Sequence, residues 1–301
     1  MSAPSRLARV RARARRAFTL VEMVISLAIL GIIGAALVRL ILAQARFSEG
    51  QMAMRSARNV SRNAMNIMLS DLRMVQDKDG LIAASRDSVT VRIPVAFGLL
   101  CSTVGGTTIS LLPVDSAMTA LGVYAGWAYR DSTLGTYTYM NAAVPTPIPN
   151  LANGVSATCT VAGISSLTYG TRSSRIVLLT DPPIGTPNPG WPAFIYEQVT
   201  YKFATSTAFP GRRGLWRLAK TSTPSAPIAD EIIAPFDSSA KFRFYALNAD
   251  QAQDTLPTNI NDVRGIEMVL AGSSVRVPEG GSQMKQAAMV TGVFFKNRRD
   301  P

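Results

Sequence analysis

The stretch of sequence that decides the fold is RRAFTLVEMVISLAILG, at residues 15–31. It opens a run of 21 residues, Phe18 to Val38, in which every residue is apolar or small except one acid, Glu22. As a helix, a run of this length rises about 30 Å, which is enough to cross the hydrocarbon core of a membrane. A carboxylate within such a helix costs roughly 2.5–3.5 kcal/mol on insertion scales. We therefore expect a retained membrane helix in which Glu22 has a functional role.

Arginine residues precede this run and supply half of the net charge of the chain. Of the formal +12, residues 1–17 carry +6, because they hold six arginines and no acid. Basic residues beside an apolar span are typical of the positive-inside rule, which keeps them in the cytoplasm. A secretory signal peptide has a shorter apolar core and a small-residue cleavage site, whereas a polar helical pattern follows Ala43 here. We expect a single-pass membrane protein with a cytoplasmic N-terminus, and we do not expect nucleic acid as a partner.

The segment AFTLVEMVISLAILGIIGAAL, at residues 17–37, resembles the N-terminus of type IV pilins and of type II secretion pseudopilins. The resemblance implies that a prepilin peptidase removes residues 1–17 as a basic leader, cutting between Ala17 and Phe18. It also implies that Phe18 becomes N-methylated and that Glu22 acts in subunit assembly. The family usually has glycine immediately before the cut, where this chain has Ala17.

Electrostatics give Glu22 a reason to be in the helix. Cleavage before Phe18 would create a cationic amine at the membrane-embedded end, and Glu22 lies one helical turn along. Because an unpaired charge is costly away from water, a pair between this carboxylate and the amine of a neighbouring subunit would favour one docking register. The alternative is an ordinary signal-anchor helix with a chance acid, in a bitopic protein that keeps its leader and never polymerises.

Helical periodicity continues beyond the membrane run. An apolar stripe recurs at helical spacing, with arginines on the other side. We expect one long helix from about Phe18 to Val75, with residues 18–43 spanning the membrane or forming a filament core and residues 44–76 as an amphipathic continuation. The stripe consists of Ala53, Ala57, Val60, Ala64, Ile67, Met68, Leu72 and Val75, and the opposite side holds Arg55, Arg58, Arg62, Asn66 and Arg73.

Residues 77–301 alternate short β-rich runs with turns, which predicts an extracytoplasmic β-rich head and an α+β fold with an antiparallel sheet. The segment IMLSDLRMV and the order of the later strands resemble PilW-type minor pilins and the pseudopilin J group. Residues 96–172 match neither and are expected to be a variable insert. The expected strands lie at 88–95, 107–114, 122–131, 136–144, 174–183, 194–205, 212–220, 240–247, 263–272 and 287–297.

The two cysteines, Cys101 and Cys159, lie near the ends of this insert. In an extracytoplasmic head an even cysteine count suggests one disulfide between them. Two unpaired buried thiols are the alternative.

Catalytic signals are missing from the sequence. The chain has no histidine, which removes the usual general base and the commonest zinc ligand. Asp230 and Glu231 are interpreted as a solvated strand start, and DKDG at residues 77–80 as a turn. The three tryptophans, Trp127, Trp191 and Trp216, are interpreted as core or sheet-face residues. We expect no enzyme activity, no cofactor and no metal.

The sequence therefore predicts a structural minor pilin or pseudopilin subunit of the bacterial inner membrane that is assembled into a type IV pilus or a type II secretion pseudopilus, at the tip or during priming. Its expected partners are the prepilin peptidase, other pilin subunits, the inner-membrane assembly platform and membrane lipid. A pilus-displayed adhesin or DNA-uptake subunit that binds through residues 96–172 is the alternative.

Overall fold

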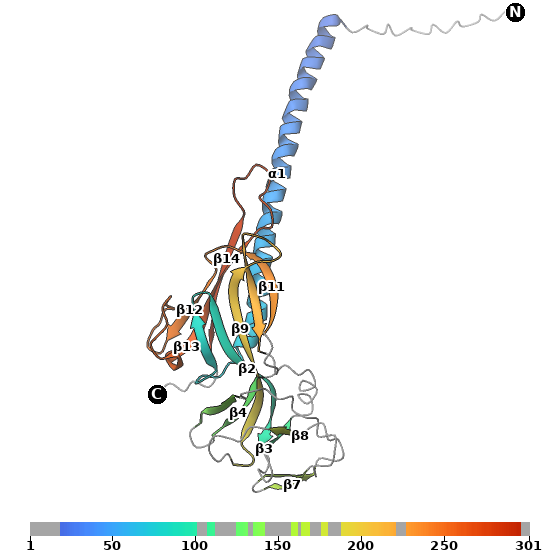
Figure 1. Ribbon diagram of the computed structural model, residues 1–301. Coiled ribbons are helices and arrows are strands. Elements are labelled where there is room, and N and C mark those ends of the chain that lie inside the picture. The colour runs from blue at the N-terminus through green and yellow to red at the C-terminus, as the bar shows by residue number, and fades with distance from the viewer. Residues whose placement is uncertain are drawn as a thin grey trace, which may run out of the picture. The chain divides into compact units, whose positions relative to one another are not determined.

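The computed structural model of the chain describes a long helix and an antiparallel β-sheet (Figure 1), and the α+β class is confirmed. The chain divides after Gln51 into two units. The structure describes residues 19–100, 107–111, 125–131, 135–141, 158–161, 164–168, 176–179, 188–220 and 227–295.

Helix α1 runs from Leu20 to Leu72 and contributes to both units. The segment contains no proline, and three glycines do not interrupt it. The helix ends in a tightened turn, because the backbone N–H of Met74 and that of Val75 each bond to a carbonyl three residues back. The expected turn at residues 77–80 follows and is confirmed, with Asp79 at a φ of 61°.

Twelve of the described strands form one sheet in which every pairing is antiparallel. The main order is β12-β13-β11-β10-β9-β2-β3-β8, with β1 beside β2, β14 beside β13, and β4 between β9 and β5. Strands β6 and β7 form a separate pair. The strands are β1 (Leu81–Ser85), β2 (Ser88–Leu100), β3 (Thr107–Leu111), β4 (Gly126–Arg130), β5 (Tyr137–Asn141), β6 (Thr158–Val161), β7 (Ile164–Thr168), β8 (Ile176–Leu179), β9 (Pro192–Thr205), β10 (Arg213–Ala219), β11 (Ile228–Phe236), β12 (Lys241–Ala246), β13 (Val263–Ser273) and β14 (Gln286–Phe294).

Each of the ten predicted strand ranges contains a strand, and the strand start predicted at Asp230 and Glu231 lies within β11, whereas β1, β6 and β7 were not predicted. Some residues of the region 96–172 belong to the main sheet. Strand β2 continues through Leu100, and β4 pairs with β9 from Gly126 to Tyr129. Part of the expected insert therefore extends the sheet of the head.

The second half of α1 packs on the sheet to form the main hydrophobic core. Its buried stripe confirms the predicted one at six positions, and the predicted arginines on the other side are exposed. The prediction that Ile67 belongs to the buried stripe is wrong, because this residue is 37% exposed. The core includes Val60, Ala64, Met68 and Leu72 from the helix and Val91, Tyr201, Phe203, Leu215, Phe242, Phe244, Ile266 and Leu270 from the sheet. Burying each large side chain contributes about 1.5–3 kcal/mol.

Ser61, which the stripe prediction did not include, is fully buried where α1 meets β13. Its hydroxyl accepts the backbone N–H of Gly272 at 2.8 Å, and it lies 3.0 Å from the Leu270 carbonyl and 2.9 Å from the Ala287 carbonyl, either of which accepts its proton. A Cβ on Gly272 would lie 2.2 Å from the carbonyl oxygen of Ala57. Only glycine therefore lets the strand approach the helix this closely.

The carboxylate of Glu231 fastens the β9–β10 hairpin to β11. It accepts hydrogen bonds from the hydroxyls of Ser206 and Thr207 and from the backbone N–H groups of Thr207, at 2.8 Å, and Ala208, at 3.3 Å. Burial opposes its ionisation, but these hydrogen bonds outweigh burial and hold the pKa of Glu231 below its usual value. Glu231 thus holds the hairpin against β11 by hydrogen bonds, in addition to its place in the predicted strand start.

Removing the hydroxyl of Ser61 is expected to weaken the contact between helix and sheet. Ser61→Ala leaves the buried Gly272 N–H without its acceptor, which costs about 1–3 kcal/mol. Gly272→Ala forces a side chain against a backbone carbonyl and costs about 1–3 kcal/mol. The measurement is urea unfolding of the full chain in detergent. Ser70→Ala, on the exposed side of the same helix, is the matched control, and equal midpoints for Ser61→Ala and Ser70→Ala would contradict the assignment.

Glu231→Gln is expected to lower the stability of the head by about 1 kcal/mol at neutral pH, because hydrogen bonds to a charged acceptor are stronger. A carboxylate with a lowered pKa stabilises the fold above its unfolded-state pKa of about 4.3, and this contribution is lost as the pH falls through the folded-state value. The loss of stability below about pH 4.3 should therefore be shallower in Glu231→Gln. Unfolding midpoints between pH 3 and 7 measure this effect, with the exposed neighbour variant Asp230→Asn as the control. Parallel profiles for Glu231→Gln and the unsubstituted chain would argue against a stabilising role of the Glu231 carboxylate.

Candidate processing and assembly site

Glu22 lies in the first turn of α1, where it forms a capping box with Thr19. The backbone N–H of Thr19 donates to Oε2 of Glu22 at 3.0 Å, and the backbone N–H of Glu22 donates to Oγ1 of Thr19 at 3.3 Å. The Thr19 hydroxyl also lies 3.2 Å from the same carboxylate oxygen. Such reciprocal bonds satisfy two of the backbone donors that the first turn leaves without partners. Glu22 therefore has a structural function at the start of the helix.

The sequence itself contains the pattern of this capping box, but Glu22 was interpreted only as an acid in a membrane helix. Thr19 and Glu22 have the T-x-x-E spacing of a capping box immediately before an apolar helical run. Among the hydrogen bonds of the described residues, none uses Oε1 of Glu22. Among the described residues the cap thus engages one carboxylate oxygen of Glu22 and leaves the other without a partner.

Ala17 and Phe18, the residues predicted to flank the cleavage site, precede the described residues. The pairing of Glu22 with a new amine at Phe18 therefore stays a prediction.

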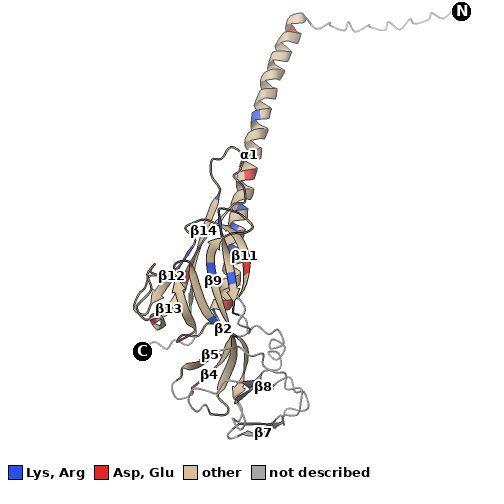
Figure 2. Ribbon diagram, viewed as in Figure 1, with Lys and Arg blue, Asp and Glu red and all other residues tan. Residues whose placement is uncertain are grey.

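The first half of α1 exposes apolar side chains all the way round. Fifteen large apolar residues between Leu20 and Leu42 are each more than half exposed, and a Cβ on Gly31 or Gly34 would meet open space. Figure 2 shows this half of the helix with few charged residues, and none occurs between Glu22 and Arg39. A helix that is apolar all round is stable inside a membrane or inside a bundle of helices. By length and composition α1 is able to cross a membrane.

A family model described as the prokaryotic N-terminal methylation motif matches residues 12–38. The chain carries a type IV pilin-like prepilin signature. This signature covers the predicted cleavage site, the capping box and the exposed apolar helix as far as Val38. It implies processing by a prepilin peptidase and assembly with other pilin subunits, and with the apolar helix it fits a membrane-anchored subunit that later enters a filament. No curated protein and no solved structure gives a significant match to the chain.

The predicted disulfide lies outside the prepilin signature and outside what the structure tests. Cys101 is not among the described residues, and of Cys159 only the backbone is described, in β6 opposite Leu167. The pairing of the two cysteines stays a prediction.

The three tryptophans make packing and hydrogen-bond contacts within the head. Trp127 is a core residue, as predicted, because its side chain is 3% exposed. Its ring lies 5.8 Å from that of Tyr129, which stacks at 5.9 Å on Trp191. Trp216 is half-buried in β10 and donates its indole N–H to the carbonyl of Thr205. Within the described part of the chain no cluster of three metal-ligating side chains occurs.

Proposed function

We propose that the chain is a minor pilin or pseudopilin subunit of a type IV pilus or a type II secretion pseudopilus, acting at the tip or in priming. The observation that carries the proposal is the FTLVE sequence, which lies within the methylation motif and opens a helix whose first half is exposed and apolar. Such a helix requires either lipid or neighbouring helices around it. A pilin-like subunit meets both in turn, first in the membrane and then in the filament.

Maturation would begin with the basic leader, residues 1–17, held in the cytoplasm by its arginines. The prepilin peptidase would cut between Ala17 and Phe18 and methylate the new amine. Residues 18–43 would remain in the inner membrane, followed by the amphipathic part of the helix to residue 76, while the head of residues 77–301 would lie outside the cytoplasm. The assembly platform would then move the subunit from lipid into the filament.

Assembly would use the carboxylate of Glu22 as a partner for the amine of Phe18 on a neighbouring subunit. An α-amino group has a pKa of about 8 and is cationic at neutral pH. In surroundings without water an unpaired charge is penalised heavily, so only the register that pairs both charges is favourable. The capping box supports this role because it holds Glu22 in one orientation with Oε1 unused.

A minor subunit is favoured over a shaft subunit by the size of the head. The sheet of the described residues has twelve strands, and part of the region 96–172 extends it. The length of this region fits PilW-type minor pilins better than the shorter pseudopilin J group. Display of a binding site is a second candidate function, and the observation that favours it is a polar pocket built partly from the same region.

Processing is tested by expressing the full chain in membranes with and without an active prepilin peptidase. The expected product with peptidase begins at N-methylated Phe18, which intact-mass and N-terminal peptide mass spectrometry detect. Ala17→Gly, which restores the residue usual in the family, should be cleaved at least as fast. An intact N-terminus beside a control prepilin that is cleaved in the same membranes would contradict the proposal.

The two roles of Glu22 are separable by substitution. Glu22→Gln keeps an oxygen acceptor for the capping box but removes the charge, whereas Thr19→Ala removes the capping hydroxyl and keeps the charge. If Glu22 pairs with an amine, Glu22→Gln should be processed normally yet lose at least tenfold of its filament incorporation, while Thr19→Ala should lose less. The measurement is the ratio of subunit in sheared filaments to subunit in membranes. Normal incorporation of Glu22→Gln would reduce Glu22 to a helix cap.

A further inference from the structure

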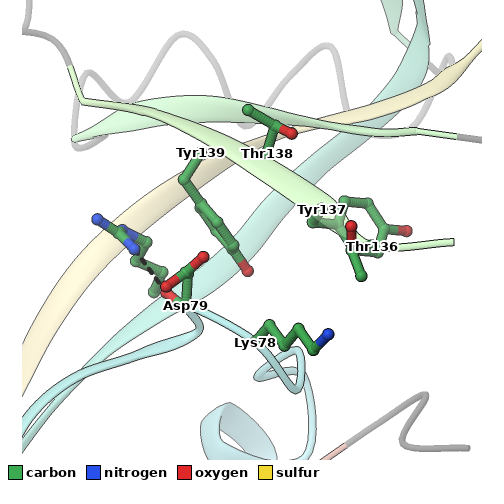
Figure 3. A pocket seen from close by; sticks show the side chains of 7 residues that line it. Lys78, Asp79, Thr136, Tyr137, Thr138 and Tyr139 are labelled. Carbon is green, nitrogen blue, oxygen red and sulfur yellow. Dashed lines mark hydrogen bonds between the residues drawn. The ribbon is translucent and has the colours of Figure 1, made fainter. Parts of the chain in front are cut away.

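A polar pocket of about 420 Å³ lies within the second of the two units (Figure 3). One wall comes from Lys78 and Asp79 in the turn before β1 and from Arg92 on β2. The other comes from Thr136 to Tyr139 at the start of β5, within the region 96–172. Its volume suits a ligand the size of a small metabolite or a sugar unit.

The guanidinium of Arg92 forms a fixed cationic wall of this pocket. Its side chain is held under two aromatic rings, with its central carbon 4.6 Å from the ring centre of Tyr139 and 5.5 Å from that of Tyr196. Nη1 donates to the backbone carbonyl of Asp79, which ties β2 to the turn. Because stacking and hydrogen bonding fix its orientation, Arg92 keeps its positive charge at one place beside the pocket.

The hydroxyl of Tyr139 is a buried donor that has no acceptor among the described residues. Tyr139 is 9% exposed, and its hydroxyl oxygen has no hydrogen-bond partner among the described residues. Burial raises the pKa of Tyr139 far above its usual value, more than Arg92 lowers it, so the hydroxyl stays protonated at neutral pH. Figure 3 shows the side chain directed toward Asp79 and Lys78. Buried polar groups without partners are rare in folded proteins, and a ligand oxygen in the pocket would satisfy this one.

The remaining lining adds donors and a net positive charge. Lys78 is exposed, and no ion pair of the described residues includes it. The carboxylate of Asp79 accepts from Nδ2 of Asn261 at 3.2 Å, and the backbone N–H of Asp79 donates to Oδ1 of Asn261 at 3.1 Å. Asp79 is thus engaged by its neighbour. With Lys78 and Arg92 against Asp79, the lining has a formal charge of +1.

We propose that this pocket binds a small anionic ligand the size of a monosaccharide, whose carboxylate or phosphate group is held by the ammonium of Lys78 and the hydroxyl of Tyr139. Tyr137 lines the pocket beside them, and its ring packs 4.9 Å from that of Phe194, so one face of the site is rigid and aromatic. The site gives the head a binding function of its own. It does not depend on processing or filament assembly and can be measured on the unassembled protein.

The test is calorimetric titration of the full chain in detergent with glucose, glucuronate and glucose 6-phosphate. These probes share a sugar ring and differ in charge and in the kind of acidic group. One or both of the acidic sugars should bind at least tenfold more tightly than glucose, and the comparison between them identifies the carboxylate or the phosphate as the group recognised. Lys78→Met and Tyr139→Phe should each weaken binding at least fivefold, whereas Lys285→Ala, at an exposed lysine beside β14, should leave it unchanged.

Tyr139→Phe also separates binding from folding. Because the hydroxyl has no hydrogen-bond partner in the described part of the chain, its removal should leave the unfolding midpoint unchanged or raise it, while the affinity falls. The proposal is overturned if neither acidic sugar binds, if glucose binds as tightly as they do, or if binding survives both Lys78→Met and Tyr139→Phe.

Discussion

The close approach of helix α1 to strand β13 at Gly272 is the constraint on which the head depends. The absence of a side chain at Gly272 brings the strand against the carbonyl of Ala57, and the hydroxyl of Ser61 then satisfies the backbone N–H that this approach buries. The other end of the packed helix is tied to the sheet by the hydroxyl of Tyr201, which donates to the carboxylate of Asp71. Between these two polar contacts the apolar stripe of α1 closes the main core. Polar groups therefore set the register of helix on sheet, and apolar burial stabilises it.

The long central strands β2 and β9 extend the sheet from the main core to the strands of the region 96–172. Strands β2 and β9 pair over nearly their whole length, and beyond the core β4 pairs with β9 on a layer of buried aromatic rings from Phe194 and Tyr196. The ring of Tyr196 faces Arg92, and its hydroxyl donates to the carbonyl of Met140. The polar pocket is therefore built on a rigid sheet rather than on loops alone.

The first half of α1 follows a different physical rule. The chain provides no cover for its apolar side chains in the described residues, and the prepilin signature lies on the same segment. Lipid and neighbouring subunits are the two surroundings in which such a surface is favourable. The capping box of Thr19 and Glu22 shows that the acid also serves the helix itself, so charge and helix capping are combined in one side chain.

The sequence by itself determined the apolar run, the prepilin signature, the buried stripe from Ala57 to Val75 and most of the strands, because these are periodic or local patterns that neighbouring residues impose on each other. It also contained the Thr19–Glu22 spacing of a capping box, although Glu22 was interpreted only by its charge. Only the tertiary structure decided the burial of Ser61, the need for glycine at position 272 and the meeting of Lys78, Arg92 and Tyr139 around one pocket. These features join residues that lie far apart along the chain, so no local period or propensity encodes them. They follow from strand order and register, which are fixed only when the sheet and the helix pack together.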